Sequence, residues 1–454
     1  MSNRELFEAL ARRMTPEVIR GVSNVVRSRF APVERSAPGP LWWRKPGIGL
    51  MYQVEYRPGW QWSRDFDEFN RSMMDAAGNL AFDGPFCRVE EWVRLSVEVG
   101  VDYHIMEIKW HDGICYFDTR LTEWKTGTDY AGQFAEASRR AGIPFMYYYS
   151  SIFDHNPQFD AIQPSGKTTS FIGIPPDPVY DEYLRGQYAE IMEQYRPDGM
   201  WIDWYWPDSP TNTTIEFFHE NYPDLVLAFN AANLLPGSYS RIDYTSGEGH
   251  DLDGSYLRIL KEESGLAAAF SSTWKWASLN RRAFAHQWEL IAPAGRWWQD
   301  PRMRDDPYDL VRMAAITMAC GGLHCTGVTA QMDGSVHPEQ VEQMRMLGEW
   351  YGPRRGIFAE AVPLRYARRE PPGVKVSPRS VRAIACRRDG DLVLHLINMD
   401  GATRPIQLEL HGKPWDGVKR AFLEPSGEEL EIAGGAALIK RDSVDPVDTI
   451  IRLN

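Results

Sequence analysis

The chain has 454 residues, of which 43% are hydrophobic and 25% are charged, a composition typical of soluble globular proteins. This length exceeds what one small core organises, so a large domain followed by a smaller one is expected. The formal net charge of −12, without a basic stripe along the sequence, argues against a nucleic-acid partner. The 17 Trp, 20 Tyr and 19 Phe fill a core and also suit a site that stacks on sugar rings.

The start of the chain and its cysteines carry no signal for secretion. The first residues, MSNRELFEALARRM, have the pattern of an amphipathic helix and lack the apolar core of a signal peptide. The five cysteines follow no metal-ligand spacing and are expected to be buried free thiols. We therefore expect a cytoplasmic protein without a membrane segment, a metal or another cofactor. The sequence leaves its oligomeric state open, a homo-oligomer included.

From about residue 45 to 330, short β-rich runs alternate with helical patterns. Strands are predicted at 48–56, 102–110, 144–151, 198–206 and 225–231, with weaker runs at 241–248, 266–274 and 315–327. Helical patterns at 85–100, 129–142 and 178–197 end at Gly or Pro. Eight strands alternating with helices predict a (β/α)8 barrel within residues 1–362, preceded by an N-terminal helical extension. An open, doubly wound sheet is the alternative.

Residues 363–454 have a different pattern. The stretch 381–412 alternates apolar and polar residues and contains DG turns, which is typical of antiparallel hairpins. We therefore expect a small C-terminal β-sandwich behind the barrel.

Polar residues follow or end several of the predicted barrel strands. Asp203 stands near the end of the fourth strand in the apolar run DGMWIDWYWPD, His111 follows the second, Tyr148 lies on the third and Glu248 ends the sixth. An acid among apolar side chains is retained where something there neutralises or uses it. Because barrel enzymes work at the C-terminal ends of their strands, we expect these four side chains to meet at one mouth.

Two carboxylates facing one pocket suit the cleavage of a glycosidic bond. One must be ionised and the other protonated near neutral pH, and an apolar site separates their pKa values in that way. Glu289, in HQWELIAP, is the rival acid/base, ahead of Glu262 and Glu263. Trp297 and Trp298, in a predicted loop at 296–307, either cover the pocket or pack the barrel. The expected partner is a small glycoside or a short oligosaccharide.

Four segments carry a family resemblance: GVDYHIMEIKWHDGICYFDTRLTEW (100–124), YAGQFAEASRRAGIPFMYYYS (130–150), YRPDGMWIDWYWP (195–207) and DYTSGE (243–248). In this order they resemble glycoside hydrolase family 29, the retaining α-L-fucosidases, over roughly residues 45–330. The resemblance implies Asp203 as the nucleophile and Glu248 as the acid/base. It further implies that His111 and Tyr148 line the sugar subsite and that Trp201 packs beside the nucleophile.

Three positions depart from the family's pattern. Gln53 stands in IGLMYQVE where the family has a sugar-binding His, and Trp110 replaces the first residue of its His-His pair. The family's Arg after the fifth strand is absent from AFNAANLL, in which Asn230 is the nearest polar residue. A site built for one set of hydroxyls rejects analogues that leave its polar groups unpaired.

The kept acids and the changed sugar contacts together predict a retaining exo-α-glycosidase acting on a sugar other than, or beyond, ordinary L-fucose. Related L-sugars, 6-deoxy sugars and pentoses are the candidates. A true α-L-fucosidase and a non-catalytic carbohydrate-binding barrel remain alternatives. A metal-dependent barrel hydrolase is disfavoured, because the ten His are scattered and no HxH follows the first strand.

Overall fold

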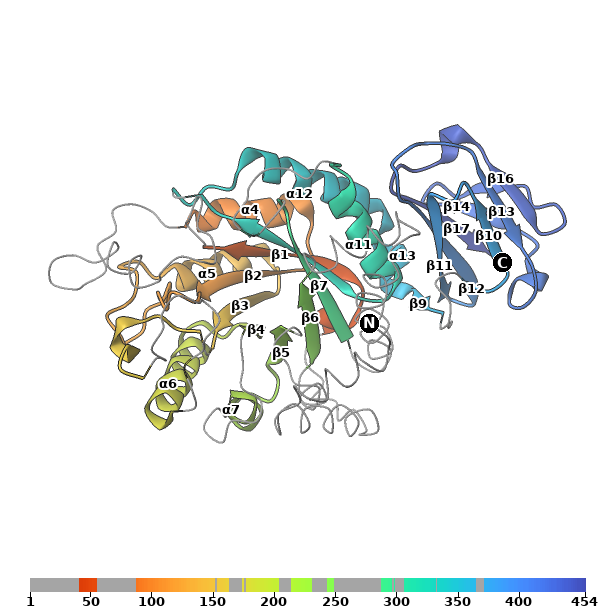
Figure 1. Ribbon diagram of the computed structural model, residues 1–454. Helices are drawn as coiled ribbons and strands as arrows, with labels where there is room; N and C mark the ends of the chain where they lie inside the picture. The colour runs from red at the N-terminus through yellow and green to blue at the C-terminus, as the bar shows by residue number, and fades with distance from the viewer. Residues whose placement is uncertain are drawn as a thin grey trace, which may run out of the picture.

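A closed barrel and a pair of antiparallel sheets make up the molecule (Figure 1). The computed structural model describes residues 41–54, 87–151, 153–162, 174, 177–203, 214–230, 243–248, 287–295, 298, 306–331, 333–364 and 371–454. Eight parallel strands pair in chain order, and the eighth pairs with the first to close the barrel. The fold is a (β/α)8 barrel followed by a β-sandwich, which confirms the prediction.

The barrel strands are β1 (Gly47–Gln53), β2 (Tyr103–Lys109), β3 (Phe145–Ser150), β4 (Gly199–Asp203), β5 (Val226–Asn230), β6 (Tyr244–Glu248), β7 (Gln287–Pro293) and β8 (Leu323–Thr329). β1 to β5 and β8 are buried along their whole length, because helices cover one face and packed side chains fill the other. Tyr147 and Tyr149 pack toward the helices while Tyr148 packs inside the barrel, as strand alternation requires.

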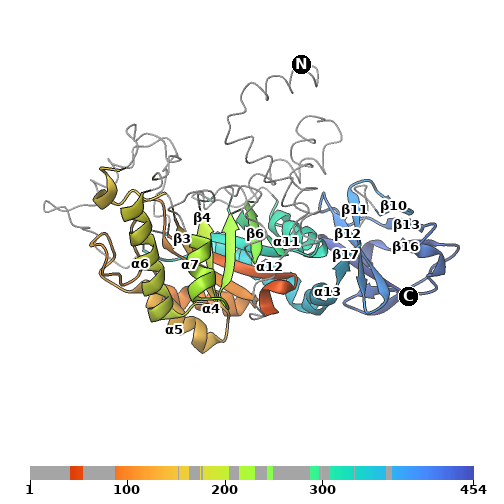
Figure 2. The same cartoon turned by 90° about the horizontal axis from the view of Figure 1, so that it is seen from below.

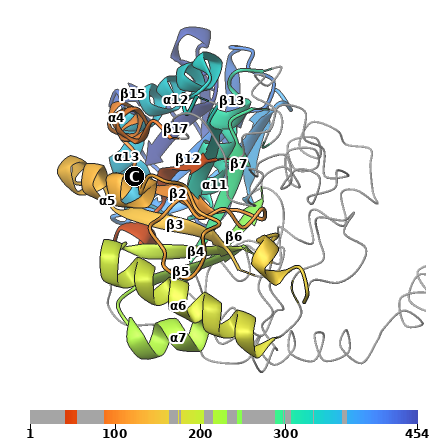
Figure 3. The same cartoon turned by 90° about the vertical axis from the view of Figure 1, so that its left-hand side faces the viewer.

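The described helices are α4 (Val89–Val99), α5 (Tyr130–Ala141), α6 (Pro178–Tyr195), α7 (Thr214–Asn221), α11 (Asp309–Ala319), α12 (Pro338–Tyr351) and α13 (Arg355–Glu360). Short 3-10 turns are η1 (Leu41–Arg44), η2 (Pro157–Phe159), η6 (Gly352–Arg354), η7 (Trp415–Gly417) and η8 (Arg441–Ser443). The three predicted helices are α4, α5 and α6, and Figure 3 shows α5 to α7 outside the strands. α4 and α5 stop at Gly100 and Gly142, whose φ angles of 68° and 69° favour glycine.

The last two barrel strands differ from the prediction. The seventh strand is Gln287–Pro293 rather than 266–274, which lies outside the described residues. The predicted strand at 315–327 is wrong in its first part, because 315–319 belong to α11 and β8 begins at Leu323. Every residue of α11 from Leu310 to Ala319 is buried, so its apolar run lacks the polar face that distinguishes a helix from a strand. The predicted helix at 1–14 and the acids Glu262 and Glu263 also lie outside the described residues.

The sandwich strands are β9 (Val362–Pro363), β10 (Val374–Ser377), β11 (Val381–Arg388), β12 (Asp391–Asn398), β13 (Ile406–Leu410), β14 (Ala421–Glu424), β15 (Glu428–Leu430), β16 (Ala436–Ile439) and β17 (Asp448–Leu453). One sheet has the order β10-β13-β16 and the other the order β15-β14-β17-β12-β11-β9. β13 alternates buried and exposed residues, as a strand with one solvated face does.

The six-stranded sheet of the sandwich joins the barrel through an apolar contact, and Figure 2 shows it beside α11 and α13. Residues 392–398 of β12 are all buried: Leu394 and Leu396 face the sandwich core, while Val393 and Ile397 join the apolar cluster of the barrel side. The Cys386 thiol donates to the Ala319 carbonyl of α11 over 3.1 Å. All five cysteines are free and four are buried, as predicted, but Cys320 is partly exposed. None of the described helices has the length and apolar content needed to span a bilayer.

Candidate active site

Asp203 is the last residue of β4, at the end of the barrel where loops leave the strands. Its Cα pairs with Ser150, the last residue of β3, and its carbonyl accepts from the Ser151 amide over 2.9 Å. The residue is only 6% exposed, although it carries a carboxylate. Its backbone is therefore fixed by the register of the sheet, and its side chain must be satisfied by neighbours inside the barrel.

Three side chains from other barrel segments surround the Asp203 carboxylate. The Tyr148 hydroxyl of β3 donates to Oδ2 over 2.5 Å, and the Asn230 amide at the end of β5 donates to Oδ1 over 3.1 Å. His111 Nε2 lies 3.9 Å from Oδ2. All four residues are buried. This arrangement presents donors to both carboxylate oxygens, which suits an ionised side chain that only accepts hydrogen bonds.

His111 is held by two aromatic rings and at Nδ1. Trp110 stacks on its ring at 4.9 Å between centroids, and Phe153 contacts it edge-on at 5.2 Å. Nδ1 lies 2.7 Å from Ser150 Oγ, and that hydroxyl gives its single proton to the Phe153 carbonyl over 2.8 Å. Nδ1 therefore carries the imidazole proton, and Nε2 is the nitrogen that faces Asp203. The chain turns directly after His111, since Asp112 Oδ1 accepts from the Ile114 amide over 2.9 Å.

Trp201 forms the floor below the carboxylate. It lies two residues before Asp203 on β4 and stacks on Tyr148 with 5.2 Å between ring centroids. Its indole donates to Glu289 Oε1 over 2.9 Å, and the Tyr103 hydroxyl donates to Glu289 Oε2. Glu289 is thus a barrel-interior residue, 1% exposed, with both oxygens engaged. Burial raises the pKa of its carboxyl, an effect that the hydrogen bond from Tyr103 and its other partners opposes.

Glu248 is the last residue of β6, as predicted, and its Cα pairs with Ile291 of β7. On the same pair of strands Ser246 pairs with Glu289, so Glu248 lies two pairings nearer the strand ends. Its side chain lies outside the described part of the structure. The backbone therefore places Glu248 at the same end of the barrel as Asp203, with Glu289 deeper.

Gln53 ends β1 on the far side of the barrel mouth. It is buried, and its Oε1 accepts no hydrogen bond from the described residues. A Cβ at Gly327 of β8 would lie 3.0 Å from this oxygen and 2.5 Å from the Trp298 ring. Glycine at this position therefore leaves the space that the Gln53 and Trp298 side chains occupy. Trp298 belongs to the apolar cluster inside the barrel. Of the two alternatives predicted for Trp297 and Trp298, packing in the barrel therefore describes Trp298, whereas Trp297 lies outside the described residues.

Several residues that shape the site were not predicted from the sequence. Ser150 and Phe153 orient the His111 ring, and Lys109 and Asp154 form a buried ion pair next to it. A strand-end Ser and a loop Phe carry no pattern of their own. Among the described residues no group of three or more His, Cys, Asp and Glu is arranged to hold a metal ion.

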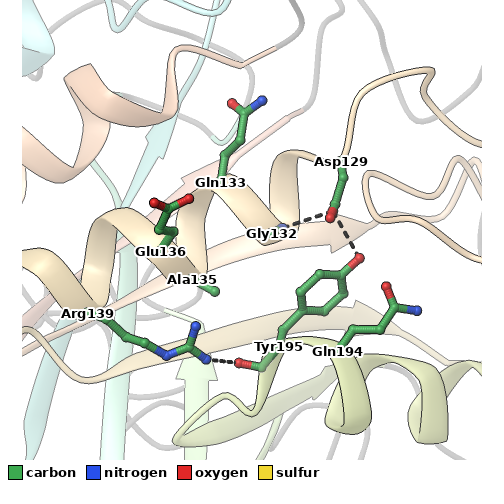
Figure 4. A pocket seen from close by; sticks show the side chains of 8 residues that line it. All are labelled: Asp129, Gly132, Gln133, Ala135, Glu136, Arg139, Gln194 and Tyr195. Atoms are coloured by element: carbon green, nitrogen blue, oxygen red, sulfur yellow. Dashed lines mark hydrogen bonds between the residues drawn. The ribbon is translucent and has the colours of Figure 1, made fainter.

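A surface cleft of about 640 Å³ lies elsewhere, between α5 and α6 (Figure 4). Its polar groups bond to one another: the Tyr195 hydroxyl donates to Asp129 Oδ1 over 2.9 Å, and the Arg139 guanidinium donates to the Tyr195 carbonyl. Asp129 also accepts from the Gly132 amide as the cap of α5. This cleft shares no lining residue with the group around Asp203 and is explained by helix packing.

Known proteins similar to this chain are α-L-fucosidases. The chain is 22% identical to the α-L-fucosidase of Dictyostelium discoideum over 282 residues, which are 59% of this chain and 55% of that protein. It is 25% identical to the tissue α-L-fucosidase of Macaca fascicularis over 206 residues, 39% of this chain and 42% of that protein. The chain thus spans about half the length of the curated relatives it matches.

The fold has a solved counterpart. The crystal structure of Thermotoga maritima α-fucosidase in complex with fucose matches with a TM-score of 0.64 and 17% identity, over 92% of this chain and 97% of that one. The family model for α-L-fucosidase matches residues 51–353, which include the end of β1, all of β2 to β8 and the residues around Asp203. The chain therefore belongs to the α-L-fucosidase family, glycoside hydrolase family 29.

Proposed function

We propose that this protein is a retaining exo-α-glycosidase with Asp203 as nucleophile and Glu248 as acid/base, acting on a small glycoside or short oligosaccharide. The observation that carries the proposal is the buried Asp203 carboxylate, fixed by Tyr148 and Asn230 and faced by His111. A carboxylate held in one direction is ready to attack an anomeric carbon without further ordering. Trp201 and Tyr148 supply the stacked apolar floor that a sugar ring needs.

The reaction has two steps in this proposal. First, an Asp203 oxygen bonds to the anomeric carbon while the glycosidic bond breaks, and Glu248 gives its proton to the departing oxygen. Second, Glu248 takes a proton from water, whose oxygen attacks the same carbon and releases Asp203. The donors on Asp203 keep the carboxylate aligned through both displacements.

The sugar is proposed to be one other than, or beyond, L-fucose. Gln53 and Trp110 stand where the family has two imidazoles, and Trp110 offers an indole N–H but no acceptor. The buried Gln53 Oε1, which no described residue supplies with a donor, suits a sugar hydroxyl. Leaving such an oxygen unpaired costs about 1–3 kcal/mol, so a substrate with a hydroxyl there is favoured about 5- to 150-fold.

The first experiment is a panel of aryl glycosides offered to the wild type and to Asp203→Ala. The panel contains α-L-fucose, α-L-galactose, α-L-rhamnose, L- and D-arabinose and common hexoses. We expect one sugar to be cleaved with retained configuration by NMR and Asp203→Ala to be inactive. Best cleavage of the α-L-fucoside would make the protein a true α-L-fucosidase and refute the sugar proposal. No cleavage, with binding of free sugar by calorimetry, would favour the non-catalytic barrel.

Gln53→His and Trp110→His test the sugar contacts directly. Each restores the family's residue, so each should raise kcat/KM for the α-L-fucoside relative to the best wild-type substrate. Leu394→Ala in the sandwich core is the control, because it lies outside the barrel site and should leave the ratio between the sugars unchanged. A uniform loss in the two His variants would contradict the assigned roles.

The acid/base assignment is tested by azide rescue. Glu248→Ala should lose activity on substrates with poor leaving groups, and azide should then form a glycosyl azide. Glu289→Ala should give no such product, because Glu289 is held inside the barrel by Trp201 and Tyr103. A glycosyl azide from Glu289→Ala but not from Glu248→Ala would reverse the assignment.

A further inference from the structure

A buried ion pair lies beside the Asp203 site and has no part in the steps above. Lys109 is the last residue of β2, and Asp154 follows β3. Lys109 Nζ lies 2.5 Å from Asp154 Oδ2, and neither side chain is exposed to solvent. Removing two charges from water costs more than their attraction alone returns, so this pair needs further partners.

Three tyrosines supply those partners. The rings of Tyr149, Tyr183 and Tyr180 lie 4.4, 5.4 and 5.9 Å from Lys109 Nζ. Nζ donates to the Tyr149 hydroxyl over 3.0 Å. The Tyr180 hydroxyl lies 3.1 Å from Asp154 Oδ2 and 2.5 Å from the Ser151 carbonyl, and it shares its one proton between these two acceptors. Burial raises the pKa of all three phenols, which therefore remain neutral. Replacing a buried ion pair by apolar groups is often neutral for stability, so stability alone does not explain the Lys109–Asp154 pair. A role in holding one local conformation is the alternative explanation.

The residues on either side of Asp154 contact His111. The His155 amide donates to the His111 carbonyl over 2.9 Å, and Phe153 contacts the imidazole ring. Asp154 Oδ1 accepts from the Asn156 amide over 2.9 Å. A Cβ added to Gly113 would lie only 2.2 Å from this oxygen. The segment after β2, which contains Gly113, is therefore in close contact with the segment after β3, which contains Asp154. Asp154 is thus the point at which the segment around His111 is attached to the barrel wall.

We propose that Lys109 and Asp154 are positioning residues, whose ion pair fixes residues 153–156 and thereby directs His111 Nε2 at Asp203. The kinetic part of this inference rests on the proposed function. The structural part does not, because the orientation of His111 is measurable without a substrate. Asp154→Asn is the primary variant, since it keeps the shape of the side chain and removes its charge.

A matched control exists in the sandwich. His395 Nδ1 and Asp448 Oδ2 are 2.7 Å apart and neither side chain is exposed, so Asp448→Asn also breaks a buried pair, far from Asp203 in the sequence and in another sheet. The double variant Lys109→Met/Asp154→Asn leaves no uncompensated charge. This double variant replaces Asp154→Asn in both measurements if the single variant does not fold.

The first readout is the NMR chemical shifts of the His111 ring, in protein labelled at its ten histidines and assigned with His111→Gln. The His111 signals should shift or broaden in Asp154→Asn or in the double variant and should stay unchanged in Asp448→Asn. Unchanged His111 signals in a folded Asp154 variant would overturn the proposal.

The second readout is a double-mutant cycle in kcat/KM on the best substrate. Asp154→Asn should lower kcat/KM roughly 10- to 100-fold, the scale of a misplaced active-site group. His111→Ala should then add less than about 3-fold in that background, but should show its full effect beside Asp448→Asn. Fully additive losses for His111 and Asp154 would overturn the proposal. If the wild type cleaves no glycoside, the proposed function fails, and the ring shifts still decide the positioning role.

Discussion

Glu289 allows a quantitative test, because it is a carboxyl that titrates inside the barrel. It is 1% exposed and accepts from Trp201 and Tyr103. Burial raises its pKa above the ordinary 4.5, although the hydrogen bonds oppose the shift. The native state therefore binds this proton more tightly than the unfolded chain does.

The sign of the pH dependence follows from that difference. Between pH 4.5 and the higher native pKa the native state holds more protons, so this carboxyl makes the protein less stable as pH rises. The loss is at most about 1.4 kcal/mol per pH unit, begins near pH 4.5 and stops above the native pKa. Glu289→Gln keeps the shape of the protonated carboxyl and does not titrate. The free energy of unfolding of the variant minus that of the wild type should therefore increase across this window.

The assay is urea unfolding followed by Trp fluorescence at several pH values from 4 to 8. Glu409→Gln serves as the control, because Glu409 is exposed on β13 and its pKa is lowered by His411 and Lys375. Its contribution is lost only as pH falls below 4.5, so its difference should stay flat from pH 4.5 to 8 and change only below pH 4.5. A Glu289→Gln difference that stays flat from pH 4.5 to 8 would refute a raised pKa at this position.

Three further outcomes are expected. Tyr148→Phe removes the hydroxyl that donates to Asp203 Oδ2 but keeps the ring that stacks on Trp201. A hydrogen bond to a charged group contributes about 1.5–3 kcal/mol, so kcat/KM should fall about 10- to 150-fold with little change in Tm. An unchanged kcat/KM would show that Tyr148 has no role in the reaction. Leu394→Ala, in the sandwich core, should lower the free energy of unfolding in denaturant by about 2–5 kcal/mol. Since the active site is proposed in the barrel, the folded variant should keep its kcat/KM, and a changed value would contradict that placement. Dialysis against EDTA should leave activity intact, since the described residues form no metal-binding group; a loss restored by a divalent cation would be contrary to this expectation.

The barrel was predictable because its buried strands are short apolar runs between helices. The seventh strand was not, and Glu289 explains why: an acid in the middle of QWELIAP interrupts the run. Its donors, Trp201 and Tyr103, are 88 and 186 positions away along the chain. A sequence pattern covers neighbouring residues, so it does not show that a distant indole and phenol satisfy this carboxyl.

The candidate site was also predictable only in part from the sequence. Asp203, His111 and Tyr148 could be located from strand ends, because the C-terminal ends of parallel strands meet at one mouth. Lys109 gave no such signal, since a lysine ending a strand is typical of a solvated surface. Its burial depends on Asp154 and on tyrosines of β3 and α6, which only the closed barrel brings together.

The sequence by itself determined the alternation of strands and helices, the antiparallel C-terminal region and the strand ends that carry the acids, because these follow from local periodicity and from residues within one segment. The tertiary structure decided which groups touch: that Tyr148 faces Asp203 while Tyr147 and Tyr149 face the helices, and that Glu289 lies below Trp201. Such contacts depend on strand register and barrel closure, which are set by the packing of all eight strands together.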